Sequence, residues 1–165
     1  MLQLFTSFSM GKHKGARSLY TSQRDAELHR AFCRAKERLL REKGYVLLSE
    51  AVDMARLSGT SRYFISEERA ASIISNILKG RKPLQTMSET KNRQFRNLYV
   101  QYQALKSQFP NLPHLELVVM ACASPAKEFY LTHKAATQIL SLIHINHKSS
   151  GIISSDQSIS HSKKK

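Results

Sequence analysis

The sequence predicts an all-α protein made of two tandem three-helix units that resemble a helix-turn-helix. Three observations predict this. When the chain is shifted by 66 residues, residues 50–78 match 116–144 without a gap, with nine identities in 29 positions, where ordinary composition gives about two. Apolar side chains recur at helical spacing in six segments. Gly or Pro interrupts the chain at corresponding points of both halves.

Composition divides the chain into five predicted regions. Residues 1–21 are basic and expected to be loosely ordered, and residues 22–80 form the first unit. A basic linker over 81–88 leads to the second unit over 89–147. Residues 148–165 are rich in Ser and Lys and cannot bury enough apolar surface to offset ordering, so we expect a disordered tail.

The first unit is expected to hold helices over about 22–43, 49–57 and 66–79. Ser22 and Asp25 match a capping box at the first start, and Gly44 ends that helix. Ser49 and Ser66 are suitable N-caps for the other two. The expected core-facing side chains are Leu28, Phe32, Ala35, Leu39, Val52, Ala55, Ala70, Ile73, Ile74 and Ile77.

The second unit repeats this plan, with helices expected over about 89–108, 113–123 and 132–147. Pro113 fits a first helical turn, where a missing N–H costs nothing. Thr132 is the expected N-cap of the third helix. The expected core-facing side chains are Phe95, Leu98, Tyr99, Tyr102, Leu105, Ala136, Ile139, Leu140 and Ile143.

A short extended connector precedes the third helix of each unit. Residues 62–65 contain Tyr63-Phe64, and residues 129–131 begin with Phe129-Tyr130. Aromatic and β-branched residues suit extended backbone. Because the pairs occupy equivalent places next to apolar helix faces, we expect them to anchor the core and not to stack on nucleic-acid bases.

The net charge of +14 is the main indication of function. The excess is shared by both halves, since residues 1–82 carry 16 basic and 8 acidic side chains and residues 83–165 carry 10 and 4. Such a chain repels itself unless a polyanion or an anionic surface is near. The candidate partners are therefore nucleic acid, an acidic protein and an anionic membrane face.

Other features narrow the cellular setting. Two cysteines make no disulfide framework, and the apolar run at the N-terminus is too short for a signal peptide. No stretch reaches the roughly 18 apolar residues that a membrane span needs. We expect a soluble, cytoplasmic protein that does not enter a membrane.

No catalytic or cofactor site is predicted. His144 and His147 share a helix face but have no suitable third metal ligand nearby. His29 and Cys33 lie one helical turn apart without an orienting group, so packing is the favoured interpretation. No glycine-rich phosphate loop occurs. We therefore expect no enzyme, no metal and no cofactor.

Nucleic-acid binding, with DNA favoured over RNA, is the leading prediction. Lys and Arg would contact phosphates, and polar side chains on the third helix of each unit would reach base edges in a groove. A regulatory role would suit such a protein. The predicted contact residues are Arg30, Arg34, Arg38, Arg41, Arg69, Ser72, Asn76, Lys79, Arg81, Lys82, Lys134, Thr137 and Gln138.

Two alternatives stay open. A protein-interaction module could bind an acidic partner, with the aromatic residues of the connectors at the contact. RNA binding is the other, because net charge does not distinguish RNA from DNA.

One segment resembles known sequences. Residues 62–70 read Arg-Tyr-Phe-Ile-Ser-Glu-Glu-Arg-Ala. This run resembles an Arg-Phe-Tyr-Val-Ser-Glu-Glu-Arg-Ala segment of small uncharacterised bacterial proteins, and residues 128–132 echo it weakly. The resemblance implies a bacterial protein and carries no activity with it.

Overall fold

The computed structural model describes the backbone of residues 14–152 and the side chains of residues 20–145. All regular structure in this part is helical, which confirms the predicted all-α class. The helices are α1 (Lys14–Lys43), α2 (Leu48–Arg56), α3 (Glu67–Leu78), α4 (Glu89–Gln108), α5 (His114–Ala123) and α6 (His133–Ile152).

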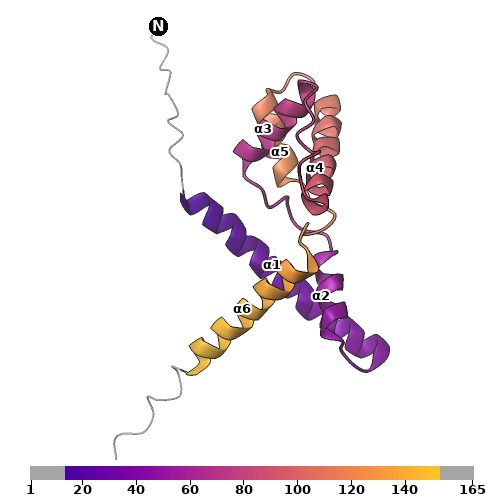
Figure 1. Cartoon of the computed structure of the whole chain (residues 1–165), viewed down its shortest axis with the longest axis vertical. Helices are drawn as coiled ribbons and strands as arrows, with labels where there is room; N and C mark the ends of the chain where they lie inside the picture. The colour runs from indigo at the N-terminus through magenta and orange to yellow at the C-terminus, as the bar shows by residue number, and fades with distance from the viewer. Residues whose placement is uncertain (1–13, 153–165) are drawn as a thin grey trace, which may run out of the picture.

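The six helices pack in two groups of three (Figure 1). The first helix group contains α1, α2 and α6, and each of these helices contacts the other two. The second helix group contains α3, α4 and α5, which also contact one another. Each group therefore combines two helices from one half of the chain with the third helix of the other half.

The two connectors meet where they cross between the groups. Thr60 and Ala126 form an antiparallel bridge, in which each backbone N–H donates to the other residue's carbonyl, at 2.9 and 3.1 Å. These two residues are 66 positions apart, which is the offset found in the sequence. A second related pair of hydrogen bonds runs from Tyr63 N to Cys122 O and from Phe129 N to Arg56 O, both at 3.0 Å.

The aromatic residues of the connectors pair across the same crossing. Tyr63 stacks on Tyr130 with centroids 5.9 Å apart, and Phe64 stacks on Phe129 at 6.3 Å. Three of these four rings are buried, which confirms that they anchor the core. Tyr130 adopts a φ of 52°, and Asn97 Nδ2 donates to its hydroxyl at 2.8 Å. Burial raises the pKa of Tyr63.

The predicted packing of consecutive helices into tandem units is wrong. Within the described residues, α3 makes no helix packing with α1 or α2, and α6 makes none with α4 or α5. The cause is the extended backbone of each connector, which places the helix after it against the helix pair of the other half. Ala70 and Ile74 of α3 are buried in the core of the second helix group. Ala136 and Leu140 of α6 fill the equivalent places in the first helix group. The predicted helix-turn-helix of consecutive helices is therefore not formed.

Several predicted helix bounds need correction. α1 begins at Lys14, eight residues before the expected Ser22, so part of the supposedly loose N-terminus is helical. The tertiary contact that Tyr20 makes with Glu67 supports this extension. The N-cap of α2 is Leu47 and not Ser49. α6 continues to Ile152, into the region expected to be disordered.

Other bounds agree with the sequence. α1 ends before Gly44 and α3 ends before Lys79-Gly80, where both glycines adopt positive φ. α4 has the predicted bounds of 89–108. The Thr132 side chain accepts from Ala135 N at 3.2 Å, as expected of the N-cap of α6.

The two groups have different cores. The second helix group contributes seven of the nine largest fully buried side chains, namely Ile74, Phe95, Leu98, Tyr102, Leu117, Val118 and Cys122. The first helix group contributes two, Leu28 and Leu39. Its other buried positions include five alanines, namely Ala31, Ala35, Ala51, Ala55 and Ala136. The same helix plan is thus filled by large side chains in one group and by small ones in the other.

Among the described helices, none combines the length and the apolar character that a bilayer crossing requires.

Candidate nucleic-acid interface

A side-chain cluster joins the N-terminal half of α1 to the start of α3. Tyr20 Oη donates to Glu67 Oε1 at 2.7 Å, and Arg62 Nη2 donates to the same oxygen at 3.1 Å. The Arg62 guanidinium lies over the Tyr20 ring, 4.4 Å from its centroid. The hydrogen bond to Glu67 is the main cause that raises the pKa of Tyr20. These contacts set the direction of α1 relative to the second helix group.

The next turns of α1 extend the same contact. Glu27 Oε2 accepts from Ser61 N at 3.1 Å, and Oε1 accepts from the Ser61 hydroxyl. The side of α1 that carries Tyr20, Arg24 and Glu27 therefore faces the first connector and α3. Helical spacing of three or four residues continues this side along α1 through three exposed arginines. They are Arg34, Arg38 and Arg41.

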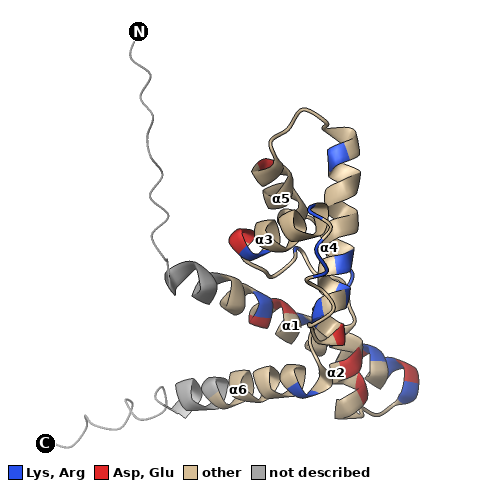
Figure 2. Ribbon diagram, turned by 45° about the horizontal axis from the view of Figure 1, so that its top comes forward, with Lys and Arg blue, Asp and Glu red and all other residues tan. Residues whose placement is uncertain are grey.

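Three cations from three helices converge beside this cluster, and we name them the basic corner: Arg24 of α1, Arg69 of α3 and Lys91 of α4. Figure 2 shows Lys and Arg on all three helices near their junction. The pKa of Lys91 is lowered, first by burial and then by the charges of Arg69 and Arg24. A lowered pKa is the direction that repulsion from neighbouring cations produces.

The basic corner is only partly neutralised. Arg24 donates two hydrogen bonds to Asp25, at 2.8 and 2.9 Å. Lys91 Nζ donates to the neutral amide of Gln94 at 2.9 Å, and Arg69 lies 6.0 Å from the centroid of the Phe95 ring. Within residues 20–145, neither Arg69 nor Lys91 has a carboxylate partner. The corner therefore retains positive charge that an anion would complement.

The structure brings one predicted contact residue, Arg69, into this corner. The four predicted arginines of α1 are exposed, and Arg34, Arg38 and Arg41 lie on the side that leads into it. Arg38 donates to Glu42 at 2.8 Å within α1, and the phosphate contacts of the α1 arginines stay a prediction. Arg24 and Lys91, by contrast, were not among the predicted contact residues.

The other predicted residues lie elsewhere. Ser72, Asn76 and Lys79 lie further along α3, whose Ser75 contacts His114 at the start of α5 at 3.0 Å. Asn76 Oδ1 accepts from Arg81 at 2.9 Å, so its amide oxygen is already engaged. Lys82 is exposed in the same linker.

The predicted residues of α6 are separated from those of α3. Lys134, Thr137 and Gln138 are exposed, and they belong to the first helix group. The Thr137 hydroxyl donates to His133 O at 3.0 Å, within its own helix. We predicted that the third helix of each unit would contact base edges while packed against the second helix of the same unit. The structure does not have this arrangement.

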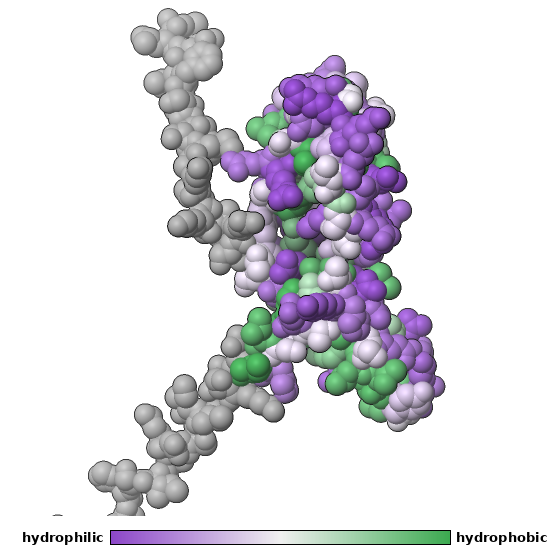
Figure 3. All heavy atoms as spheres, in the orientation of Figure 1, coloured by the Kyte–Doolittle hydropathy of each residue, from purple (hydrophilic) through white to green (hydrophobic). Residues whose placement is uncertain are grey.

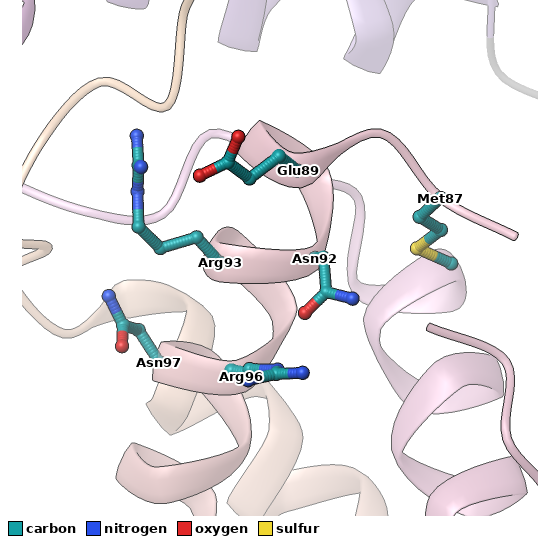
Figure 4. A pocket seen from close by; sticks show the side chains of 6 residues that line it. All are labelled: Met87, Glu89, Asn92, Arg93, Arg96 and Asn97. Carbon is teal, nitrogen blue, oxygen red and sulfur yellow. The ribbon is translucent and has the colours of Figure 1, made fainter. Parts of the chain in front are cut away.

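An open hollow of about 480 Å³ lies on the N-terminal half of α4 (Figure 4). Most of its polar side chains hold the fold together. Asn92 Nδ2 donates to Leu84 O at 3.0 Å, Asn97 donates to Tyr130, and Arg93 pairs with Glu128 at 2.5 Å. Arg96 is exposed at its edge. The hollow lies between the N-terminal half of α4 and the end of the linker at Met87.

The two cysteines lie in different surroundings, Cys122 buried in the core and Cys33 partly exposed on α1. Burial raises the pKa of the Cys122 thiol to about 12, which opposes thiolate formation. Cys33 Sγ lies 3.9 Å from His29 Nε2 within α1, as the spacing predicts. In the part of the chain with described side chains, no three His, Cys, Asp or Glu come together as a metal site. His147 lies outside those residues.

The sequence did not indicate that Arg24 and Lys91 lie in one basic corner, because α3 packs with the helices of the other half of the chain. They are 67 positions apart, and only the packing of α3 beside α4, with α1 held to α3, brings them together. The helical spacing from Tyr20 to Arg24 was the one signal available in the sequence.

Comparison with protein-family models, curated proteins and solved structures finds no match to this chain.

Proposed function

We propose that this protein binds nucleic acid without catalysing a reaction, with duplex DNA favoured over RNA. The observation that carries the proposal is the basic corner, where Arg69 and Lys91 have no carboxylate partner within residues 20–145. The corner belongs to a chain with a net charge of +14. A phosphate there would offset the mutual repulsion of the cations and raise the pKa of Lys91.

The shape of α1 favours a stiff polyanion. A helix of 30 residues is about 45 Å long, and its exposed arginines follow one side away from the corner. Cations along a straight helix suit a duplex, whose phosphates are also regularly spaced. A single strand would have to be straightened to meet them, at an entropic cost.

Duplication of a 66-residue unit is part of the proposal. Support comes from the bridge between Thr60 and Ala126 and from the related hydrogen bonds of Tyr63 and Phe129, which follow the same offset. The outer faces of the third helices differ, because Asn76 of α3 corresponds to exposed Leu142 of α6. We therefore assign phosphate binding to the basic corner and to the side of α1 that carries Arg34 and Arg41, which points away from Lys36. The third helices are not assigned two equal roles in base recognition.

The proposal is tested by fluorescence anisotropy with a labelled random duplex DNA and a single-stranded RNA, each over a salt series. The double variant Arg69→Glu/Lys91→Glu should weaken duplex binding at least about tenfold and lower the salt slope by about two, because two phosphate contacts are lost. Both replaced side chains are partly exposed, so folding should survive.

The matched control is Lys36→Glu/Lys106→Glu, which makes the same change in net charge away from the corner. Lys36 and Lys106 are both exposed. The control should lose much less affinity than the corner variant. Equal losses would show that only net charge matters. No binding to either nucleic acid at low salt would overturn the proposal and favour an acidic protein as the partner.

A further inference from the structure

The turn between α1 and α2 carries an apolar surface, which we name the α1–α2 tip. Four large side chains within nine residues are exposed there, at 57% for Leu40, 62% for Tyr45, 54% for Leu47 and 62% for Leu48. Figure 3 shows hydrophobic residues at this end of the molecule. Single exposed apolar residues are ordinary on protein surfaces, but a cluster of this kind marks a binding surface.

Over the equivalent residues 106–114 of the second helix group, Phe109 is the one large apolar side chain that is exposed, at 43%. Leu48 corresponds to His114, whose ring contacts Ser75 Oγ at 3.0 Å and Tyr102 Oη at 2.9 Å. Leu112 of the same turn packs against the core. The helix arrangement therefore does not require four exposed apolar side chains at this turn, and the larger apolar surface belongs to the first helix group.

The α1–α2 tip is held in one shape. Gly44 N donates to Leu40 O at 2.9 Å, and Ala51 N donates to Leu47 O at 3.0 Å. Lys43 Nζ pairs with Glu50 Oε1 at 2.6 Å across the turn. A surface fixed in this way loses little conformational entropy when a partner binds.

The charges around the α1–α2 tip indicate which partner fits. Residues 36–50 carry four basic and three acidic side chains, so the tip is almost neutral in a chain of +14. Arg38 and Lys43 are paired within the chain with Glu42 and Glu50, at 2.8 and 2.6 Å, so the tip itself offers an acidic partner little net attraction. A second copy carries the same nearly neutral surface and would meet little repulsion there, as an isologous contact allows.

We propose that the α1–α2 tip is a dimerisation surface that binds the same surface of a second copy of this chain. Apolar contact between the two tips supplies the attraction, and the mixed charges around them make close approach possible in an otherwise positive protein. The inference is independent of nucleic-acid binding.

Sedimentation velocity of the nuclease-treated full chain, from low to high micromolar concentration, tests this inference. We expect a species of twice the 18.8 kDa chain mass that grows with concentration. High salt should preserve or strengthen it, because screening reduces repulsion between the copies. Association through residual nucleic acid would instead weaken with salt. A wild type that stays monomeric, or a dimer that salt dissolves, would overturn the inference.

The variant Leu47→Glu/Leu48→Glu should be monomeric throughout. Glu at the start of α2 suits the helix dipole and both positions are exposed, so the fold should be kept. The matched control is Val100→Glu/Leu115→Glu, which replaces residues of the second helix group that are 66% and 58% exposed. The control should dimerise like the wild type, and loss of its dimer would contradict the assignment of the surface.

Circular dichroism should show equal helix content in both variants. Tyr45→Glu, in the turn itself, is the second test if the double variant at the tip is unfolded. It should weaken the dimer at least about tenfold, since it places a charge in the apolar contact. A dimer of unchanged affinity in Tyr45→Glu would contradict the inference.

Discussion

The two helix groups share one plan of contacts but differ in how they are filled. In the second helix group, Phe95, Leu98 and Tyr102 of α4 pack on α3 and α5. In the first helix group, the buried side chains of α1 include the small Ala31 and Ala35. Large side chains such as Leu47 and Leu48 are exposed there. The comparison teaches that one arrangement of helices can be filled either by large buried side chains or by alanines, with large side chains left exposed in the second case.

The largest effect expected from this difference concerns two leucines that are both fully buried, Leu98 of α4 and Leu28 of α1. Leu98→Ala should lower the free energy of unfolding by about 4 kcal/mol and Leu28→Ala by about 2–3 kcal/mol. The reason is that large, tightly packed neighbours leave a cavity around position 98, whereas the alanine-rich first group can collapse around position 28.

Urea denaturation followed by circular dichroism measures both values. Equal losses of unfolding free energy in the two variants would show that the two cores respond alike to a truncated leucine. The two helix groups would then differ only in which side chains are exposed.

A smaller effect concerns pH, because a carboxylate links α2 to α6 in the first helix group. His133 Nδ1 donates to Asp53 Oδ1 at 3.0 Å, and Arg56 donates to the same carboxylate. The hydrogen bond from His133, followed by that from Arg56, lowers the pKa of Asp53 from 3.8. A depressed carboxyl pKa adds stability above the ordinary pKa, and this stability is lost as pH falls through the lower folded value.

Asp53→Asn should therefore reduce the loss of stability on acidification from about pH 5 to about pH 3. The difference from wild type should be at most about 1 kcal/mol, because the Asp53 side chain is 44% exposed. The comparison requires urea titrations of both proteins at each pH. In the second helix group, α3 and α5 are linked by Ser75 and His114 at 3.0 Å, a contact that contains no carboxylate.

The smallest effect should be the same in both groups. Gly44 and Gly80 end α1 and α3 with φ of 75° and 72°, and a Cβ added at either would meet no atom within 4 Å. Each Gly→Ala change should cost about 1 kcal/mol through backbone strain alone. Thermal unfolding of the two variants checks this. Clearly unequal costs would mean that the groups differ in their helix ends as well as in their cores.

Local sequence signals predicted where most helices lie in the chain, but they did not predict which helices pack against one another. Gly44, Gly80 and Thr132 marked helix ends through backbone chemistry that does not depend on distant residues. The start of α1 was missed because the contact between Tyr20 and Glu67 spans 47 positions. Of the predicted phosphate contacts, only Arg69 reaches the basic corner, because its neighbours there come from α1 and α4.

By itself, the sequence determined the all-α class, the aromatic anchors of the connectors and the 66-residue offset, because helix periodicity and repeated residues are local properties of the chain. Tertiary structure alone decided which helices pack together. The apolar faces of α3 and α6 are similar enough for either to fit either helix pair, so their periodicity does not specify a partner. The crossing of the connectors, with its paired hydrogen bonds and stacked rings, selects the exchanged arrangement and thereby assembles the basic corner.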